Sequence, residues 1–290
     1  MGAKLTKTQI SLIKSLVNQA VSEDLNGSCD ITTVATVPLT QEATGLFYVK
    51  SDGILAGLEI AKIVFEKVDP KLKFETVTAD GYEVTKGTVF AKVSGSARSI
   101  LTAERTALNF LQRMSGIATL THKFVEGVKP HKAKILDTRK TVPGLRILDK
   151  MAVKIGGGEN HRFGLYDMVL IKDNHIEAAG SVTKAIQAAK KYALGKHLIE
   201  VEVKDLSELK EALLQNPDRI MLDNMTVEEM AKAVKITNGQ VPLEASGNVS
   251  LDTVKKIAQT GVDYISIGAL THSVKALDIS LEIISKRKGA

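Results

Sequence analysis

Hydrophobic and polar residues alternate in two different ways along the chain. Up to about Ala97, segments such as GLFYVKSD and VFAKVSGSA alternate with a period of two, which predicts short strands. Asp-Gly pairs at 52–53 and 80–81 interrupt them, and helical patterns cover about 5–23 and 55–68. This part of the chain favours a sheet with a few helices, an α+β arrangement.

From residue 134 onward, the pattern becomes a series of short apolar runs. In chain order, these runs are KILDT, MVLIKD, LIEVEV, RIMLDN, PLEASG and YISIGA. Amphipathic helices separate the later runs, and two of these helices start with capping-box spacing, at Asp205 with Glu208 and at Thr226 with Glu229. Strand–helix units of this kind indicate a parallel sheet, because parallel strands need a crossover connection.

The polar or small residues that end the last four runs recur at a regular interval. Glu202, Asp223, Ser246 and Gly268 are 21, 23 and 22 residues apart. This period favours an α/β barrel, with an open doubly wound sheet as the alternative.

Composition narrows the class of protein. The 290 residues are 44% hydrophobic and 25% charged, which is typical of a globular chain, and no apolar run approaches the roughly 20 residues that span a bilayer. Cys29 is the only cysteine, which excludes an internal disulfide and a cysteine-built zinc site and favours a reducing, cytoplasmic compartment. The net charge of +6 suits an anionic ligand or nucleic acid, but 4% aromatics and no Trp make a base-stacking surface improbable. We therefore expect neither a nucleic-acid nor a membrane partner.

In a barrel, the residues at the carboxyl ends of the strands surround the active site. Selected by that position alone, the set comprises residues 137–140, Lys172, Glu202, Asp223, 246–248 and 267–269. Cations, carboxylates and small residues with free backbone N–H groups are thus expected at one rim.

The last two strand-to-helix turns predict a phosphate site. Ser246, Gly247 and Asn248 precede a helix expected near Ser250, and Ile267, Gly268 and Ala269 precede another near Thr271. Backbone N–H groups at helix N-termini after the last two strands of a barrel commonly bind phosphate. Two ordinary turns are the alternative interpretation. Neither a P-loop nor a dinucleotide-binding glycine motif is present.

Glu202 and Asp223 each end a strongly apolar strand, where an unpaired carboxylate is costly. Each could form an ion pair with a neighbouring Lys or Arg. A function fits the rim better: the two carboxylates could hold ribose hydroxyls, hold Mg²⁺, or face a developing positive charge.

The segment 137–175 is unusually rich in cations. We expect Lys150 and Lys154 to be solvated on a helix at about 144–155, whereas Arg139, Lys140, Arg162 and Lys172 lie at strand ends or in loops. Several cations around one pocket imply a ligand with several negative charges. His161 could donate to a carboxylate, and the glycines 156–158 would let backbone pass close to the ligand.

Arg105 lies at the edge of an apolar helical face in ILTAERTALNFLQRM, residues 100–114. It could be a surface residue with an internal ion pair. Alternatively, this face contacts another subunit and brings Arg105 into a site.

Taken together, these motifs resemble one known family. TRKTVPGLR, GGGENHRFGL, LIKDNHI, EVEV, LDN, EASGN and GVDYISIGALTHS, in this order, are similar to quinolinate phosphoribosyltransferase. EDLNGSCDITT at 23–33 and the segment 100–119 resemble its N-terminal part, with Cys29 and Asp30 where the family has glycine and aspartate. The resemblance implies an incomplete TIM-like α/β barrel of about seven strands at 113–274. It also implies an N-terminal α+β sandwich domain at 1–112, onto which 275–290 pack back.

The resemblance also implies an activity and a role for each site residue. The substrates would be quinolinate and phosphoribosyl pyrophosphate, the products nicotinate mononucleotide, pyrophosphate and carbon dioxide, and the cofactor Mg²⁺. Quinolinate would bind Arg139, His161, Arg162 and Lys172, with Thr138 nearby, and Lys140 would serve the pyrophosphate and the chemistry. Glu202 and Asp223 would hold the ribose and Mg²⁺, and 246–248 with 267–269 would take the 5′-phosphate. The resemblance implies a homodimer with shared active sites, in which Arg105 would reach the partner's pocket, and it leaves a higher assembly open.

Three other functions are compatible with the residues. One is a Schiff-base aldolase with Lys172 as nucleophile, although the neighbouring Asp173 disfavours an activated amine. The second is a barrel that only senses a phosphorylated metabolite. The third is a family relative that acts on another pyridine acid.

Overall fold

The computed structural model describes residues 6–284, which form two compact units, each built around its own sheet. The first unit contains residues 6–120, 142–157 and 273–284, and the second contains 121–141 and 158–272. The division is not a single cut in the chain, and the sequence-based boundary at 112–113 remains a prediction. No helix within 6–284 is long and apolar enough to cross a membrane.

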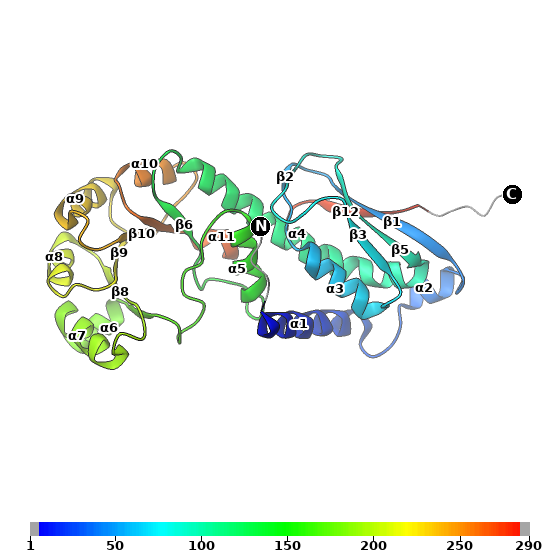
Figure 1. The fold of residues 1–290 in the computed structure, drawn as a ribbon, viewed down its shortest axis with the longest axis horizontal. Helices are drawn as coiled ribbons and strands as arrows, with labels where there is room; N and C mark the ends of the chain where they lie inside the picture. The colour runs from blue at the N-terminus through cyan, green and yellow to red at the C-terminus, as the bar shows by residue number, and fades with distance from the viewer. Residues whose placement is uncertain (1–5, 285–290) are drawn as a thin grey trace. The chain divides into compact units, whose positions relative to one another are not determined.

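The first unit is a mixed α+β structure, as expected from its alternating pattern (Figure 1). Its elements are α1 (Lys7–Leu25), α2 (Ile31–Thr36), β1 (Glu42–Val49), β2 (Gly53–Ile54), α3 (Leu58–Val68), β3 (Lys73–Thr76), β4 (Glu83–Val84), β5 (Val89–Ser96), α4 (Ala97–Gly127, whose last turns belong to the second unit), α5 (Arg146–Ile155) and β12 (Ile279–Ile284). The main sheet has the order β12-β1-β5-β3 and is antiparallel. A cluster of Phe47, Phe65, Phe74 and Phe90 fills its core, with ring centroids 5.6–5.9 Å apart.

The C-terminal segment that the sequence predicts to pack back contributes a strand to this sheet. β12 pairs with β1 in an antiparallel register from Val49↔Ile279 to Thr44↔Ile284. Residues 285–290 lie outside the described part of the chain. The main sheet is therefore built from both ends of the described chain.

Helix α5 corrects one prediction from the charge pattern. Lys150 is only 2% exposed, so the expected solvated position is wrong for this residue, whereas Lys154 is exposed as predicted. The same helix turn carries Asp149, which is fully buried and accepts two hydrogen bonds from Arg113, at 2.7 and 2.8 Å. Helix α5 therefore buries charged residues as well as apolar ones. The amphipathic pattern of the sequence does not show which charged residues are buried.

The second unit is an incomplete α/β barrel: within the described residues its parallel sheet has six strands, one fewer than expected, and its two edge strands do not pair with each other. Its elements are β6 (Lys134–Leu136), β7 (Val169–Ile171), α6 (Asp173–Ala179), α7 (Val182–Ala193), β8 (Ile199–Val203), α8 (Leu206–Leu214), β9 (Arg219–Asp223), α9 (Val227–Thr237), β10 (Leu243–Ser246), α10 (Val254–Gln259), β11 (Tyr264–Ser266) and α11 (Ala269–His272). Each of the six apolar runs forms one strand, in the order β6-β11-β10-β9-β8-β7. All pairings are parallel, and Glu159 adds a parallel bridge to Leu136.

Helices α7 to α10 line the outside of this curved sheet (Figure 1). Strand side chains alternate between the two faces, and those that face the helices are apolar. Val201, Leu222 and Ala245 are each fully buried on that side. The opposite face carries Glu202, Asp223 and other polar groups and forms the interior of the barrel.

Helix starts follow the predicted caps, with small differences. Thr226 and Glu229 form the complete capping box at the start of α9. Asp205 caps α8, but the Glu208 carboxylate accepts from the N–H of Lys204 instead of that of Asp205, so this box is incomplete. α10 begins at Val254, four residues later than expected, because Ser250 and Thr253 first form a side-chain-bonded turn.

Candidate active site

A cavity of about 780 Å³ opens at the carboxyl ends of the barrel strands. Its lining includes fourteen of the fifteen residues that the sequence singled out: Thr138, Arg139, Lys140, His161, Arg162, Lys172, Glu202, Asp223, Ser246, Gly247, Asn248, Ile267, Gly268 and Ala269. All of them belong to the second unit. Residues up to 131 positions apart in the chain are thereby gathered around one space.

One expectation about the lining, that for the glycines 156–158, has a different outcome, whereas the expected role of Arg105 in a partner's pocket stays a prediction. Arg105 is exposed on α4 and is not among the residues that line this cavity. The glycines 156–158 do not line it either; they follow the end of α5, where Gly157 has a left-handed φ of +91°. The glycine run therefore ends a helix instead of approaching a ligand.

Arg139 and Arg162 concentrate positive charge at one side of the cavity. Burial, followed by the charge of Arg139, lowers the pKa of Arg162. The Nη1 of Arg162 donates to the carbonyl of Met168 at 3.2 Å, while its buried Nε has no hydrogen-bond partner within residues 6–284. A pair of neighbouring guanidinium groups with an unused donor suits an anionic ligand.

Lys172 and Glu202 form an ion pair across the cavity rim, between the start of α6 and the end of β8. The Glu202 side chain is 12% exposed and that of Lys172 is 44% exposed. Asp223 ends the next strand, and its Oδ2 accepts a hydrogen bond from Asn224 at 3.0 Å. Both carboxylates thus line the cavity, and that of Glu202 contacts a movable cation.

The turn after β10 has room for backbone only. Gly247 has a φ of +97°, and a Cβ at this position would lie 2.1 Å from the Oδ1 of Asn224. Asn224 and Asn248 both have left-handed φ values, and the Nδ2 of Asn248 donates to the Oδ1 of Asn224 at 3.3 Å. At this predicted phosphate site, the turn therefore has no side chain at position 247, and its backbone packs closely against Asn224.

The turn after β11 is equally close to Lys140. A Cβ on Gly268 would lie 2.9 Å from the Cδ of Lys140, and the hydroxyl of Thr271 donates to the Lys140 carbonyl at 2.7 Å. α11 begins at Ala269, two residues earlier than expected. Lys140 is thereby fixed beside the second glycine turn.

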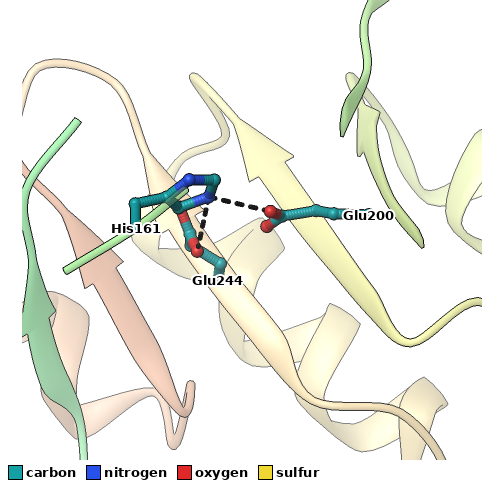
Figure 2. A group of neighbouring side chains, drawn as sticks. All are labelled: His161, Glu200 and Glu244. Carbon is teal, nitrogen blue, oxygen red and sulfur yellow. Dashed lines mark hydrogen bonds and ion pairs between the residues drawn. The ribbon is translucent and has the colours of Figure 1, made fainter. Parts of the chain in front are cut away.

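In the wall of this cavity, His161 contacts two buried carboxyl groups, Glu200 on β8 and Glu244 on β10 (Figure 2). The His161 Nε2 lies 2.8 Å from the Oε2 of Glu200 and 3.6 Å from the Oε2 of Glu244. Burial raises the pKa of both carboxyl groups to about 7, and for Glu244 the charge of Glu200 adds to this effect. We call Glu200 and Glu244 the buried carboxyl pair.

The lining includes residues that the sequence-based selection missed: Leu170, Asp173, Met221, Asn224, Glu244, Val249, Ser266 and His272. Four of these each lie two residues before a predicted position, on the same face of the strand: Leu170, Met221, Glu244 and Ser266. The alternation in MVLIKD, RIMLDN, PLEASG and YISIGA was a usable signal for them, because residues i and i+2 of a strand face the same side. Asn224 and His272 depend on turn geometry, for which the sequence carries no comparable pattern.

The fold and the cavity together define a class of protein: an α/β barrel in which cations and two close backbone turns share one pocket, an arrangement typical of sites for phosphate-bearing anions. The quinolinate phosphoribosyl transferase C-terminal domain model matches residues 117–282, and the N-terminal domain model matches 30–115. The chain belongs to the quinolinate phosphoribosyltransferase family.

Individual relatives agree with this assignment. The chain is 51% identical to the mitochondrial quinolinate phosphoribosyltransferase [decarboxylating] 2b of Nicotiana tabacum, over 93% of this chain and 82% of the relative. It is 43% identical to the nicotinate-nucleotide pyrophosphorylase [carboxylating] of Mycobacterium leprae, over 96% of this chain and all of the relative. The crystal structure of NadC from Streptococcus pyogenes is 40% identical, with a TM-score of 0.93 over 98% of this chain and 99% of that one.

Proposed function

We propose that the chain transfers the phosphoribosyl group of phosphoribosyl pyrophosphate to quinolinate and releases carbon dioxide, giving nicotinate mononucleotide and pyrophosphate for NAD synthesis. One observation carries the proposal: a single cavity combines Arg139, Lys140, Arg162 and Lys172 with two carboxylates and two backbone turns. Quinolinate supplies two carboxylates for the cations, and the second substrate supplies a phosphate for the turns. The names of the relatives support the same reaction.

The quinolinate side of the cavity would be formed by Arg139, Arg162 and Lys172, with Thr138 and His161 close by. Two like-charged guanidinium groups next to each other are unfavourable without a ligand. A dicarboxylate placed against them relieves this repulsion and can accept bidentate hydrogen bonds. The pocket would therefore select a pyridine ring with two adjacent carboxylates.

The phosphoribosyl side would be formed by the two turns and the two strand-end carboxylates. Residues 246–248 and 267–269 would take the 5′-phosphate, and Lys140 lies beside the second turn. In the second turn the N–H groups would come from Gly268 and Ala269, because that of Ile267 donates to the Leu136 carbonyl at 3.0 Å. Glu202 and Asp223 would hold the ribose hydroxyls and face the positive charge that develops on the ribose as pyrophosphate leaves. Fixed charges of this kind stabilise a transition state without reorganisation.

The donor set also fits Mg²⁺, which prefers oxygen ligands and usually keeps waters while it binds one or two carboxylates and substrate phosphates. Asp223 is half-buried at the rim and Glu202 keeps one oxygen outside its ion pair with Lys172, so both could take part. Mg²⁺ would supply charge neutralisation for the leaving pyrophosphate.

Decarboxylation then needs no further cofactor. Once the ring nitrogen carries the ribose, the ring is a pyridinium. The C–C bond to the carboxylate next to the nitrogen then breaks and carbon dioxide leaves, while the electron pair stays on the ring carbon, is stabilised by the positive nitrogen and takes up a proton from water. The cations hold the remaining carboxylate, so the ring stays oriented during this step.

We also propose a homodimer in which Arg105 acts in the partner's site. This helix position is exposed, and Arg105 does not line the cavity of its own chain. Dimer formation, any higher assembly and a cytoplasmic location remain predictions; the location is supported by the single cysteine.

The aldolase alternative gains no support. The Lys172 Nζ, which would attack a carbonyl, contacts the Glu202 carboxylate instead. Borohydride trapping in the presence of a carbonyl substrate would leave no adduct on Lys172 if the transferase proposal holds.

The direct test is incubation with quinolinate, phosphoribosyl pyrophosphate and Mg²⁺. Nicotinate mononucleotide should accumulate with both substrates and not with either alone. Binding of both without any product would favour a sensor and contradict the proposal. Product formation from another pyridine acid but not from quinolinate would favour a family relative of different specificity.

A further inference from the structure

Both ring nitrogens of His161 are engaged inside the protein. The backbone N–H of Arg162 donates to the His161 Nδ1 at 2.8 Å, so Nδ1 is the acceptor and carries no proton. The ring proton is therefore on Nε2, which lies 2.8 Å from the Oε2 of Glu200 (Figure 2). This arrangement defines the neutral Nε2–H tautomer.

The buried carboxyl pair accepts that proton in a closed environment. Glu200 and Glu244 are fully buried, and the His161 side chain is only 5% exposed. The Nη1 of Arg219 donates to the Oε2 of Glu244 at 2.8 Å, and its guanidinium lies 4.1 Å from the centre of the Tyr264 ring. Arg219 thus neutralises part of the charge of the pair.

A bound metal ion is a weaker interpretation of the same cluster. The ligand atoms of His161, Glu200 and Glu244 lie within 4.8 Å of one another. However, the 2.8 Å distance from Nε2 to Glu200 is that of a direct hydrogen bond, and Arg219 already supplies a cation to Glu244. The Oε2 atoms of both carboxyl groups are therefore already engaged within the protein, whereas their buried Oε1 atoms have no hydrogen-bond partner within residues 6–284.

The His161 segment is also fixed at its backbone. The buried carboxylate of Asp137 accepts from the His161 N–H at 2.9 Å and from the Nδ2 of Asn160 at 2.5 Å. The next residue is Arg162, which lines the cavity with its unused Nε. The hydrogen bonds of the His161 ring thus link the buried carboxyl pair to the backbone of Arg162.

We propose that His161 is a positioning residue for Arg162, held by Glu200 and Glu244, and does not itself donate a hydrogen bond to the substrate. The proposal rests on the proposed function in one respect, that quinolinate is the ligand of Arg162. The proposal also assigns a role to the buried carboxyl pair, which the transfer reaction does not use directly. The pair holds His161 as the Nε2–H tautomer, whose Nδ1 accepts the Arg162 N–H.

A double-mutant cycle on the quinolinate dissociation constant tests this. His161→Leu should weaken quinolinate binding roughly tenfold to a hundredfold, because small misplacements of a binding group are costly. On an Arg162→Ala background, measured with millimolar quinolinate by ligand-detected NMR, the same substitution should have little further effect. An equal loss on both backgrounds would mean that His161 contacts the ligand independently, and would overturn the proposal.

Two variants control for misfolding. His161→Asn, whose side-chain oxygen can take the place of Nδ1, should recover most of the affinity lost in His161→Leu. His197→Leu, at a histidine that does not line the cavity, should leave affinity unchanged. No recovery in the Asn variant while its thermal unfolding matches wild type would contradict the proposal.

A second measurement does not depend on the ligand or on catalysis. The ¹⁵N NMR signals of His161, assigned by its loss in His161→Asn, should show an unprotonated Nδ1 and a protonated Nε2, unchanged when quinolinate is added. An imidazolium, a protonated Nδ1, or a stoichiometric metal bound to the cluster would overturn the proposal. Failure of wild-type protein to bind quinolinate, with the tautomer as expected, would contradict the proposed function alone.

Discussion

At the scale of single residues, neighbouring cations have different surroundings. Arg139 is half-buried, with its Nε shielded from solvent, whereas Lys140 is exposed and lies against the second glycine turn. A cation in the interior of a pocket contributes mainly to binding, whereas one that faces a leaving group contributes to the transition state.

Substitution should separate these two roles. Arg139→Ala should mainly raise the KM for quinolinate, by the equivalent of about 2–5 kcal/mol, because a buried charge pair is lost. Lys140→Ala should mainly lower kcat. Steady-state kinetics with each substrate varied would measure both effects. If both variants changed only the KM for quinolinate, the assigned roles would be wrong.

The buried carboxyl pair predicts a dependence of stability on pH. Burial, followed by the charge of Glu200, raises the pKa of Glu244 from 4.5 to about 7, so between these values the folded state binds more protons than the unfolded state. The free energy of unfolding contributed by this group is therefore present at low pH and falls as pH rises through this window.

Glu244→Gln should remove that loss. Its free energy of unfolding relative to wild type should rise between pH 5 and pH 8, by on the order of 1–3 kcal/mol. Urea unfolding of both proteins at the two pH values measures the difference. A difference that stays constant or falls with rising pH would contradict the raised pKa.

At the scale of elements, the sequence predicted where the strands lie better than it predicted which of their residues face the interior of the barrel. The six apolar runs became the six strands of the parallel sheet, because a strand covered on one side by helices needs continuous apolar residues there. Residues at the strand ends could therefore be selected by position. Glu244 and Ser266 were missed because they lie inside the apolar runs, where a polar residue is interpreted as an interruption instead of an inward-facing group.

The turn after β10 allows a sharp test at this scale. Gly247→Ala would place a methyl group against Asn224 and impose strain at a φ of +97°. We expect the KM for phosphoribosyl pyrophosphate to rise by roughly tenfold or more, because the strained turn would lose one or two backbone hydrogen bonds to the phosphate.

Gly239→Ala is the matched control, because Gly239 also has a positive φ, +74°, but nothing lies within 4 Å of an added Cβ. It should lose about 1 kcal/mol of stability and keep its KM. Equal KM values in both variants would show that this turn does not hold the phosphate.

At the scale of the whole molecule, the sequence left two matters open. The grouping of residues 142–157 with the first unit depends on tertiary contacts, such as the Arg113–Asp149 ion pair. The local sequence pattern does not predict such contacts. The role of Arg105 depends on a second copy of the chain. An exposed position on one chain does not identify its partner.

Subunit mixing tests the shared site. If Arg105 acts in the partner's pocket, Arg105→Ala and Lys172→Ala should each be inactive as folded dimers. In a hybrid dimer, one pocket carries both substitutions and the other carries neither. Random exchange makes about half of the dimers hybrid, so activity should recover to about a quarter of wild type. No recovery after verified exchange would place Arg105 outside the partner's pocket.

The central claim is that one cavity joins phosphoribosyl transfer to loss of a carboxylate. Quinolinate labelled with ¹³C in the carboxylate next to the ring nitrogen, incubated with Mg²⁺ and phosphoribosyl pyrophosphate, tests it most directly. Labelled carbon dioxide and nicotinate mononucleotide should form in equal amounts, only when phosphoribosyl pyrophosphate is present, and nicotinate should not replace quinolinate because it leaves the cations unpaired. Carbon dioxide released without phosphoribosyl pyrophosphate, or comparable turnover of nicotinate, would contradict the account.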